Sequence, residues 1–141
     1  MSVRRRVPVQ ASGESVILFR VAGWRFGVNA VDVKEIRELD PHWRDEKDGA
    51  VTIRLGEELG LKARGEHRVL MLRGLDVGIA VDEVEKMTVV REVLPLPAIF
   101  RGREREWYTG LLVLEGLVVP LLNSMDFAFR SGSAASPGAR Q

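Results

Sequence analysis

Short apolar segments separated by turn residues recur along the chain, and a long amphipathic helix is missing. Residues 16–21 (VILFRV) form the first predicted strand, a glycine turn at 22–24 follows, and residues 25–28 form the second. Residues 51–55 predict a further strand, and residues 56–61 (GEELGL) predict a single helical turn or a tight bend. Short strands with regular turn signals indicate a mostly β domain.

Two pairs of apolar segments have the spacing of β-hairpins. Residues 68–72 and 77–81 flank the loop RGLD, and residues 111–114 and 117–122 flank a two-residue turn. Pro120 has no backbone N–H to donate, so it predicts an edge or a bulge in the last of these strands.

Residues 29–39 (NAVDVKEIREL) are the exception, because they predict a short helix. Asn29 can cap its start, and Asp32 is favourable in the first turn, where the positive end of the helix dipole lies. On such a helix Val33 and Ile36 share one face, since residues three apart are neighbours.

The segments LLVL, LVVPLL and VLML are apolar on both faces of the strand. A strand has this composition when both of its faces meet protein. Two β layers packed on each other would produce it. The chain therefore predicts a two-layer β structure.

Residues 77–81 alternate branched residues with Gly78 and Ala80. The branched residues are expected to fill a core, and the nearly bare opposite face would let another backbone come close. Asp82 and Glu83 then predict a surface crossing, where the chain leaves one layer for the next. A strand followed by a simple bend is the alternative.

The totals describe an ordinary globular chain with charged ends. Of 141 residues, 45% are hydrophobic and 29% charged, and no run of about 18 apolar residues predicts a membrane span. Residues 1–14 carry three arginines and one glutamate, and residues 130–141 carry two arginines, which leaves residues 15–129 with 16 basic and 19 acidic residues. We expect two disordered tails, 1–14 and 130–141, around a folded domain over 15–129. Its net charge of −3 matches nucleic-acid phosphates poorly.

Groups that carry catalysis or bind metals are scarce. The chain has no cysteine, which excludes disulfides and thiolate metal sites and makes the cytoplasm the simplest location. His42 and His67 lack a partner at metal-ligand spacing. Asp82 and Glu83 would point to opposite faces of a strand, so they cannot act as an acid–base pair. Nothing indicates an enzyme, and we expect no cofactor and no metal.

Three stretches, taken in order, resemble the CheW-like domain of bacterial chemotaxis coupling proteins. They are a strand–turn–strand opening that ends in V-x-E-I-R, a V-G-I-x-V-D-x-V strand pair, and a closing P-x-P, Y-x-x-G and L-L-N; here they fall at residues 17–39, 76–90 and 94–123. The resemblance covers about residues 16–125. It implies an all-β fold with short helices, built from two packed, small, five-stranded SH3-like barrels.

The family resemblance also implies a function. Such proteins are non-catalytic adaptors that couple a chemoreceptor's cytoplasmic tip to the regulatory domain of a CheA-type histidine kinase. Val33, Glu35 and Ile36 fall on the V-x-E-I motif that faces the receptor tip. Ile99, followed by Phe100, falls where the family places an apolar residue that contacts the kinase domain.

Each set of candidate residues has an alternative interpretation. Val33 and Ile36 could be core residues with Glu35 solvated. Ile99 could be buried beneath the loop RGREREW at residues 101–107, whose alternating charges favour a solvated loop over a nucleic-acid contact.

One segment departs from the family pattern. Residues 40–49 (DPHWRDEKDG) replace a longer segment that usually contains N-L-R-G, and Arg54 replaces an aspartate. One barrel is therefore either incomplete or closed differently, and the partner is either a standard chemoreceptor or a specialised substitute. A small nucleic-acid-binding β-barrel, with arginines 4–6 as a basic arm, is the alternative function.

Overall fold

The computed structural model describes residues 14–38, 51–62, 65–98 and 104–128. The expected tails, apart from Glu14, lie outside these ranges, as do the shortened segment at 40–49 and arginines 4–6. The described elements are β1 (Glu14–Val21), β2 (Trp24–Asn29), the 3-10 turn η2 (Ala30–Asp32), β3 (Val33–Glu38), β4 (Val51–Arg54), α1 (Leu55–Leu59), β5 (Arg68–Leu72), β6 (Val77–Val81), β7 (Glu83–Val90), β8 (Val93–Leu94), α2 (Glu104–Trp107), β9 (Tyr108–Leu114) and β10 (Leu117–Leu122). The expected mostly β fold with short helices is confirmed.

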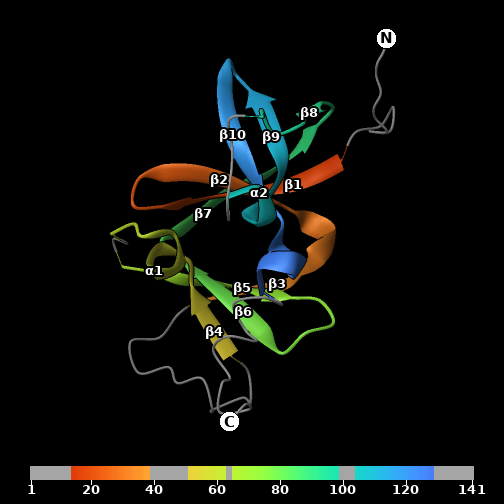
Figure 1. Cartoon of the computed structure of the whole chain (residues 1–141). Coiled ribbons are helices and arrows are strands. Elements are labelled where there is room, and N and C mark those ends of the chain that lie inside the picture. The colour runs from red at the N-terminus through yellow and green to blue at the C-terminus, as the bar shows by residue number, and fades with distance from the viewer. Residues whose placement is uncertain (1–13, 39–50, 63–64, 99–103, 129–141) are drawn as a thin grey trace.

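The strands form two sheets, one above the other in Figure 1. The upper sheet has six strands in the order β7-β1-β2-β10-β9-β8, and the lower sheet has four in the order β3-β5-β6-β4. The described strands thus divide into six and four. Two packed sheets of this size are consistent with two small barrel-like subdomains.

Strand β1 explains why segments of this chain are apolar on both faces. Its residues Ile17, Phe19 and Val21 belong to a core shared with β5 and β6 of the other sheet. Its alternate residues Val16 and Leu18 belong to a second core, formed within the six-stranded sheet together with residues of β9 and β10. Because side chains alternate along a strand, β1 contributes to both cores at once, as the two-layer prediction required.

Both expected hairpins are present. β5 pairs with β6, and β9 pairs with β10 around a turn in which Glu115 and Gly116 have φ of 51° and 80°. β10 also pairs with β2, but only at Leu121 and Leu122, and its register with β9 shifts between these two residues. The edge or bulge expected at Pro120 is confirmed, because β10 pairs with β2 only at the two residues that follow Pro120.

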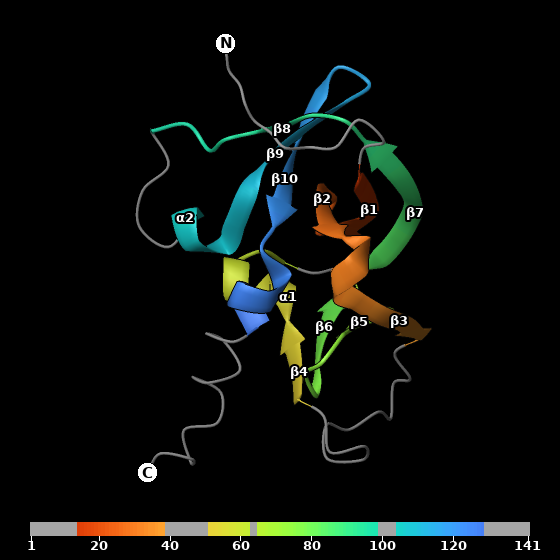
Figure 2. The same ribbon diagram turned by 90° about the vertical axis from the view of Figure 1, so that its right-hand side faces the viewer.

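The helix expected over residues 29–39 is wrong. Only Ala30–Asp32 form a single 3-10 turn, and the V-x-E-I residues continue as strand β3. Figure 2 shows the chain passing from β2 through η2 into β3 at the margin of the molecule. Pairing with β5 supplies the backbone hydrogen bonds that a two-turn helix, with its costly nucleation, would have to provide alone.

The close approach expected at Gly78 exists, but its partner is not a backbone. A Cβ at this position would lie 2.5 Å from Val69 Cγ1 and 2.8 Å from Met71 Sδ. Both side chains come from β5, where Met71 is directly paired with Gly78. The small face of β6 therefore accommodates large side chains of its neighbouring strand.

Candidate functional site

A bulge in β3 arranges the V-x-E-I residues. Val33 pairs with Leu72 and Ile36 with Leu70. Val33 and Ile36 are three positions apart on β3, whereas Leu72 and Leu70 are only two apart on β5. The extra residue is Lys34, and a bulge of this kind shifts the side-chain alternation by one position. Val33 and Ile36 therefore lie on the same face of the sheet as Leu70 and Leu72 of β5. The expectation that the two residues share a face holds, although it was based on a helix.

The two residues differ in accessibility. Val33 is buried in the core between the sheets, whereas Ile36 is 42% exposed near the rim of that core. β3 is also the terminal strand of its sheet, so within the described residues its outer backbone edge has no strand partner. Of the two, only Ile36 can contact a partner without disturbing the core.

Glu35 lies on the other face of β3. It pairs with Met71, which faces away from the inter-sheet core. Its carboxylate accepts a hydrogen bond from Arg37 Nε at 2.8 Å and also lies 2.6 Å from Arg37 Nη2. The strand thus presents an apolar side chain on one face and an exposed ion pair on the other.

Arg73 fixes the corner that leads into β3. Its backbone N–H donates to the Asp32 carbonyl at 2.9 Å, and its guanidinium donates to the carbonyls of Val31 and Val33 at 3.0 and 3.2 Å. From the other side, the buried Ser124 hydroxyl donates to the Asp32 carboxylate at 3.4 Å. These contacts set the direction in which β3 projects.

Asp82 joins the two sheets. It lies between β6 and β7, so the crossing expected there is confirmed, but Asp82 is buried and not at the surface. Its carboxylate accepts the N–H of Ala22 at 2.8 Å and the N–H of Glu66 at 3.1 Å. Ala22 belongs to the β1–β2 turn and Glu66 to the loop before β5, so one side chain ties together both sheets.

Glu85 is the extra residue of a second bulge. In the pairing of β1 with β7, Leu18 faces Lys86 and Phe19 faces Val84. The intervening carboxylate hydrogen-bonds to Arg20 and lies 2.9 Å from Arg25 Nε. Burial alone would raise the pKa of Glu85, but the hydrogen bond and charge of Arg20 and the charge of Arg25 outweigh it and lower the pKa.

This lowered pKa makes a pH-dependent contribution to stability. The ionised carboxylate stabilises the fold above the ordinary value of 4.5, and the contribution disappears as the pH falls through the lower folded-state pKa. Glu85→Gln should therefore reduce the free energy of unfolding by about 1–3 kcal/mol at pH 7, and the difference should vanish in acid. Urea unfolding between pH 3 and 7 measures this, with the more exposed Glu83→Gln as control. An undiminished difference at pH 3 would contradict it.

The residues expected to contact the kinase domain, Ile99 and Phe100, lie outside the described residues, so this contact stays a prediction. Within the described ranges no group of three or more His, Asp or Glu side chains could hold a metal ion. No helix in that part of the chain is long and apolar enough to cross a membrane.

Sequence patterns did not reveal the roles of Arg73 and Asp82. Each acts through hydrogen bonds to backbone groups distant in the sequence, and such contacts leave no periodic signal. The only clue at Asp82 was an acidic residue directly after an apolar strand, which indicated a turn as readily as a buried joint.

The fold has a known counterpart. The crystal structure of the scaffolding protein TtCheW from Thermoanaerobacter tengcongensis superposes with a TM-score of 0.64 over 79% of this chain and 89% of that chain, at 18% identity. The two-sheet architecture is thus a CheW-like fold.

Sequence comparison defines the family. The chemotaxis protein CheW of Rhizobium meliloti (strain 1021) is 30% identical over 139 residues, which cover 84% of this chain and 89% of the relative. No protein-family model matches the chain. At this identity and coverage, the chain belongs to the CheW family. Membership supports a scaffold or adaptor role in chemotaxis.

Proposed function

We propose that the chain is a non-catalytic cytoplasmic adaptor that couples a chemoreceptor tip, or a specialised receptor-like substitute, to the regulatory domain of a CheA-type histidine kinase. Family membership supports the chemotaxis role. The outer edge of β3, which has no strand partner among the described residues, carries the proposed receptor contact together with its accessible apolar side chain.

The receptor tip docks beside β3. Ile36 and Val31 of the preceding turn, 42% and 71% exposed, offer an apolar surface for a partner helix. Glu35 lies on the other face of the same strand in an ion pair with Arg37, and this exposed pair at the edge of β3 can fix the register of that helix. Val33 supports this surface from inside the core, while Arg73 holds its corner in place.

The kinase regulatory domain binds through other residues. We assign this contact to Ile99 and Phe100, because these residues occupy the family's apolar position after P-x-P. Because the two proposed contacts use different residues, one adaptor can hold both partners at once.

Substitutions at the two surfaces should have separate effects. Ile36→Asp should weaken binding of the cognate receptor-tip fragment at least about ten-fold, because a charge replaces a central apolar contact. The same variant should leave binding of the kinase regulatory domain unchanged. Ile99→Asp should instead weaken binding of the kinase regulatory domain and leave binding of the receptor-tip fragment unchanged. Isothermal titration calorimetry of both fragments against each variant measures this.

Met87→Asp is the matched control, since Met87 is 62% exposed on β7 and lies outside the proposed contacts. Circular dichroism should show that all three variants fold. The proposal fails if Ile36→Asp binds the receptor fragment as tightly as the wild type does.

A further inference from the structure

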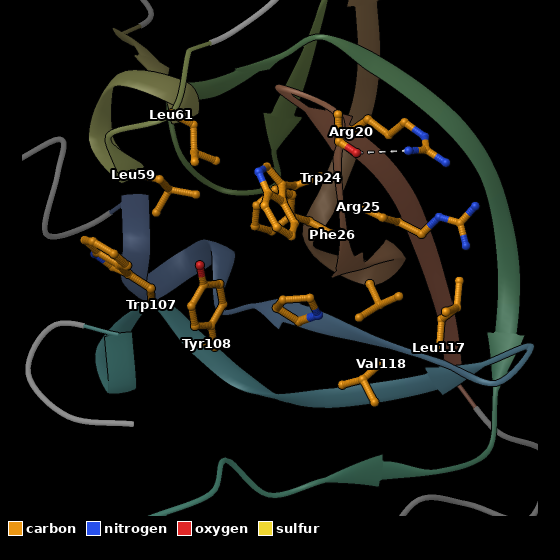
Figure 3. Close-up of a pocket in the computed structure, with 13 residues that line it drawn as sticks. Arg20, Trp24, Arg25, Phe26, Leu59, Leu61, Trp107, Tyr108, Leu117 and Val118 are labelled. Carbon is orange, nitrogen blue, oxygen red and sulfur yellow. Dashed lines mark hydrogen bonds between the residues drawn. The ribbon is translucent and has the colours of Figure 1, made fainter. Parts of the chain in front are cut away.

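An apolar cavity of about 660 Å³ has no residue of β3 among its described lining. Figure 3 shows Trp24, Arg25 and Phe26 of β2 on one side of it and Leu117 and Val118 of β10 on another. Further apolar side chains line it from the segment around α1, from α2 and from the last hairpin: Leu59, Leu61, Trp107, Tyr108, Val119 and Pro120. In Figure 2, β3 lies at the right-hand margin, whereas α1, which contributes Leu59, lies nearer the centre of the molecule.

The cavity exists because two neighbouring strands diverge. β2 and β10 run parallel but pair only where Gly27 and Val28 meet Leu121 and Leu122. The two hairpins that contain these strands, β1–β2 and β9–β10, point in different directions (Figure 1). The strands therefore diverge towards their first residues, Trp24 of β2 and Leu117 of β10. Residues 24–26 of β2 therefore have no pairing strand on this side among the described residues. A free strand edge beside an apolar cavity can pair with an extended peptide segment.

The exposure of the lining indicates a protein partner. Trp24 is 65% exposed, and Leu117 and Val118 are each 58% exposed. Pockets for small molecules enclose most of their ligand, whereas these side chains stand open at the rim. Exposed tryptophan and arginine around an apolar centre are typical of residues that dominate protein–protein binding.

The charges around the cavity favour an acidic partner. Arg20 and Arg25 line it, and among the residues that the structure describes no acidic side chain does. Both guanidinium groups approach the single carboxylate of Glu85, while Glu83, at 4.0 Å from Arg20, is mostly exposed to solvent. Two cations share one close anion, so a partner carboxylate finds complementary charge beside the apolar lining.

We propose that this cavity is a docking site for an extended segment of a partner protein. The segment pairs with the free edge of β2, inserts a large apolar side chain between Trp24 and Leu117, and places an acidic residue beside Arg25. This surface is additional to the contact proposed for β3.

Selection from a displayed library of random twelve-residue peptides on the immobilised full chain tests the site. Enriched peptides should combine large apolar residues with Asp or Glu. Their affinity, measured by fluorescence polarisation, should fall at least about ten-fold for Leu117→Glu. Val113→Glu on the same hairpin, which is exposed but does not line the cavity, should bind as the wild type does. Arg25→Gln should lose the preference for acidic over neutral peptides.

Two results would overturn the proposal. One is that no peptide is enriched, or that enriched peptides bind wild type and Leu117→Glu equally. The other is concentration-dependent self-association of the chain that Leu117→Glu abolishes, since a second copy would then occupy the cavity. Neither result bears on receptor binding at Ile36, so this inference and the proposed function can fail separately.

Discussion

Asp82→Ala is expected to lower the free energy of unfolding by about 3–5 kcal/mol, because it removes a buried carboxylate and leaves two partly buried N–H groups without this acceptor. Those groups belong to Ala22 and Glu66, which have φ of 56° and 48°. This left-handed conformation is unfavourable for residues other than glycine, and the carboxylate holds both residues in it. Urea unfolding at pH 7 measures the loss.

Two control variants distinguish the loss of the Asp82 hydrogen bonds from a general effect of removing a negative charge. Asp82→Asn keeps one acceptor oxygen and should lose about half as much stability. Glu83→Ala removes an adjacent, exposed carboxylate and should change stability by less than about 0.5 kcal/mol. If Asp82→Ala were as stable as Glu83→Ala, Asp82 would not tie the two sheets together.

Gly78→Val should destabilise the fold by about 3 kcal/mol through overpacking. Its Cβ would fall 2.5 Å from Val69 Cγ1, on a β-branched side chain that has few alternative rotamers. Met71, at 2.8 Å, is unbranched and can move more easily. The melting temperature and the urea midpoint measure the change.

A double variant shows whether Val69 is the cause. Val69→Ala alone should be mildly destabilising, but in combination with Gly78→Val it should restore most of the lost stability. An unchanged melting temperature for Gly78→Val would mean that the face between β5 and β6 is not closely packed.

The strands were predictable because their signals are local. Residues 68–81 and 111–122 each contain two apolar runs and a turn, and both hairpins follow from that order alone. β1 was predictable as a two-faced strand, since VILFRV is apolar at successive positions. Which sheet each strand joins was not predictable, because pairing depends on contacts distant in the sequence.

The error at residues 29–39 has a specific cause. Val33 and Ile36 have the i, i+3 spacing of a helix face, yet the bulge at Lys34 gives the same spacing on a strand. The pattern of apolar positions correctly predicted that both residues share a face. It could not distinguish a helix from a bulged strand.

The sites were less predictable than the fold. Ile36 and Glu35 came from the family motif, but their opposite orientations depend on the strand geometry. No sequence pattern indicated the cavity beside Trp24, because its lining residues come from segments far apart in the sequence: the first hairpin, the segment around α1, and α2 with the last hairpin. Only the packed fold brings those segments together.

The central claim is that one chain holds a receptor tip and a kinase regulatory domain at the same time. Sedimentation velocity of the chain mixed with both cognate fragments at micromolar concentrations tests it most directly. We expect a single boundary containing all three components, larger than either binary complex. Absence of binding to both fragments, or displacement of one fragment by the other, would contradict the adaptor function.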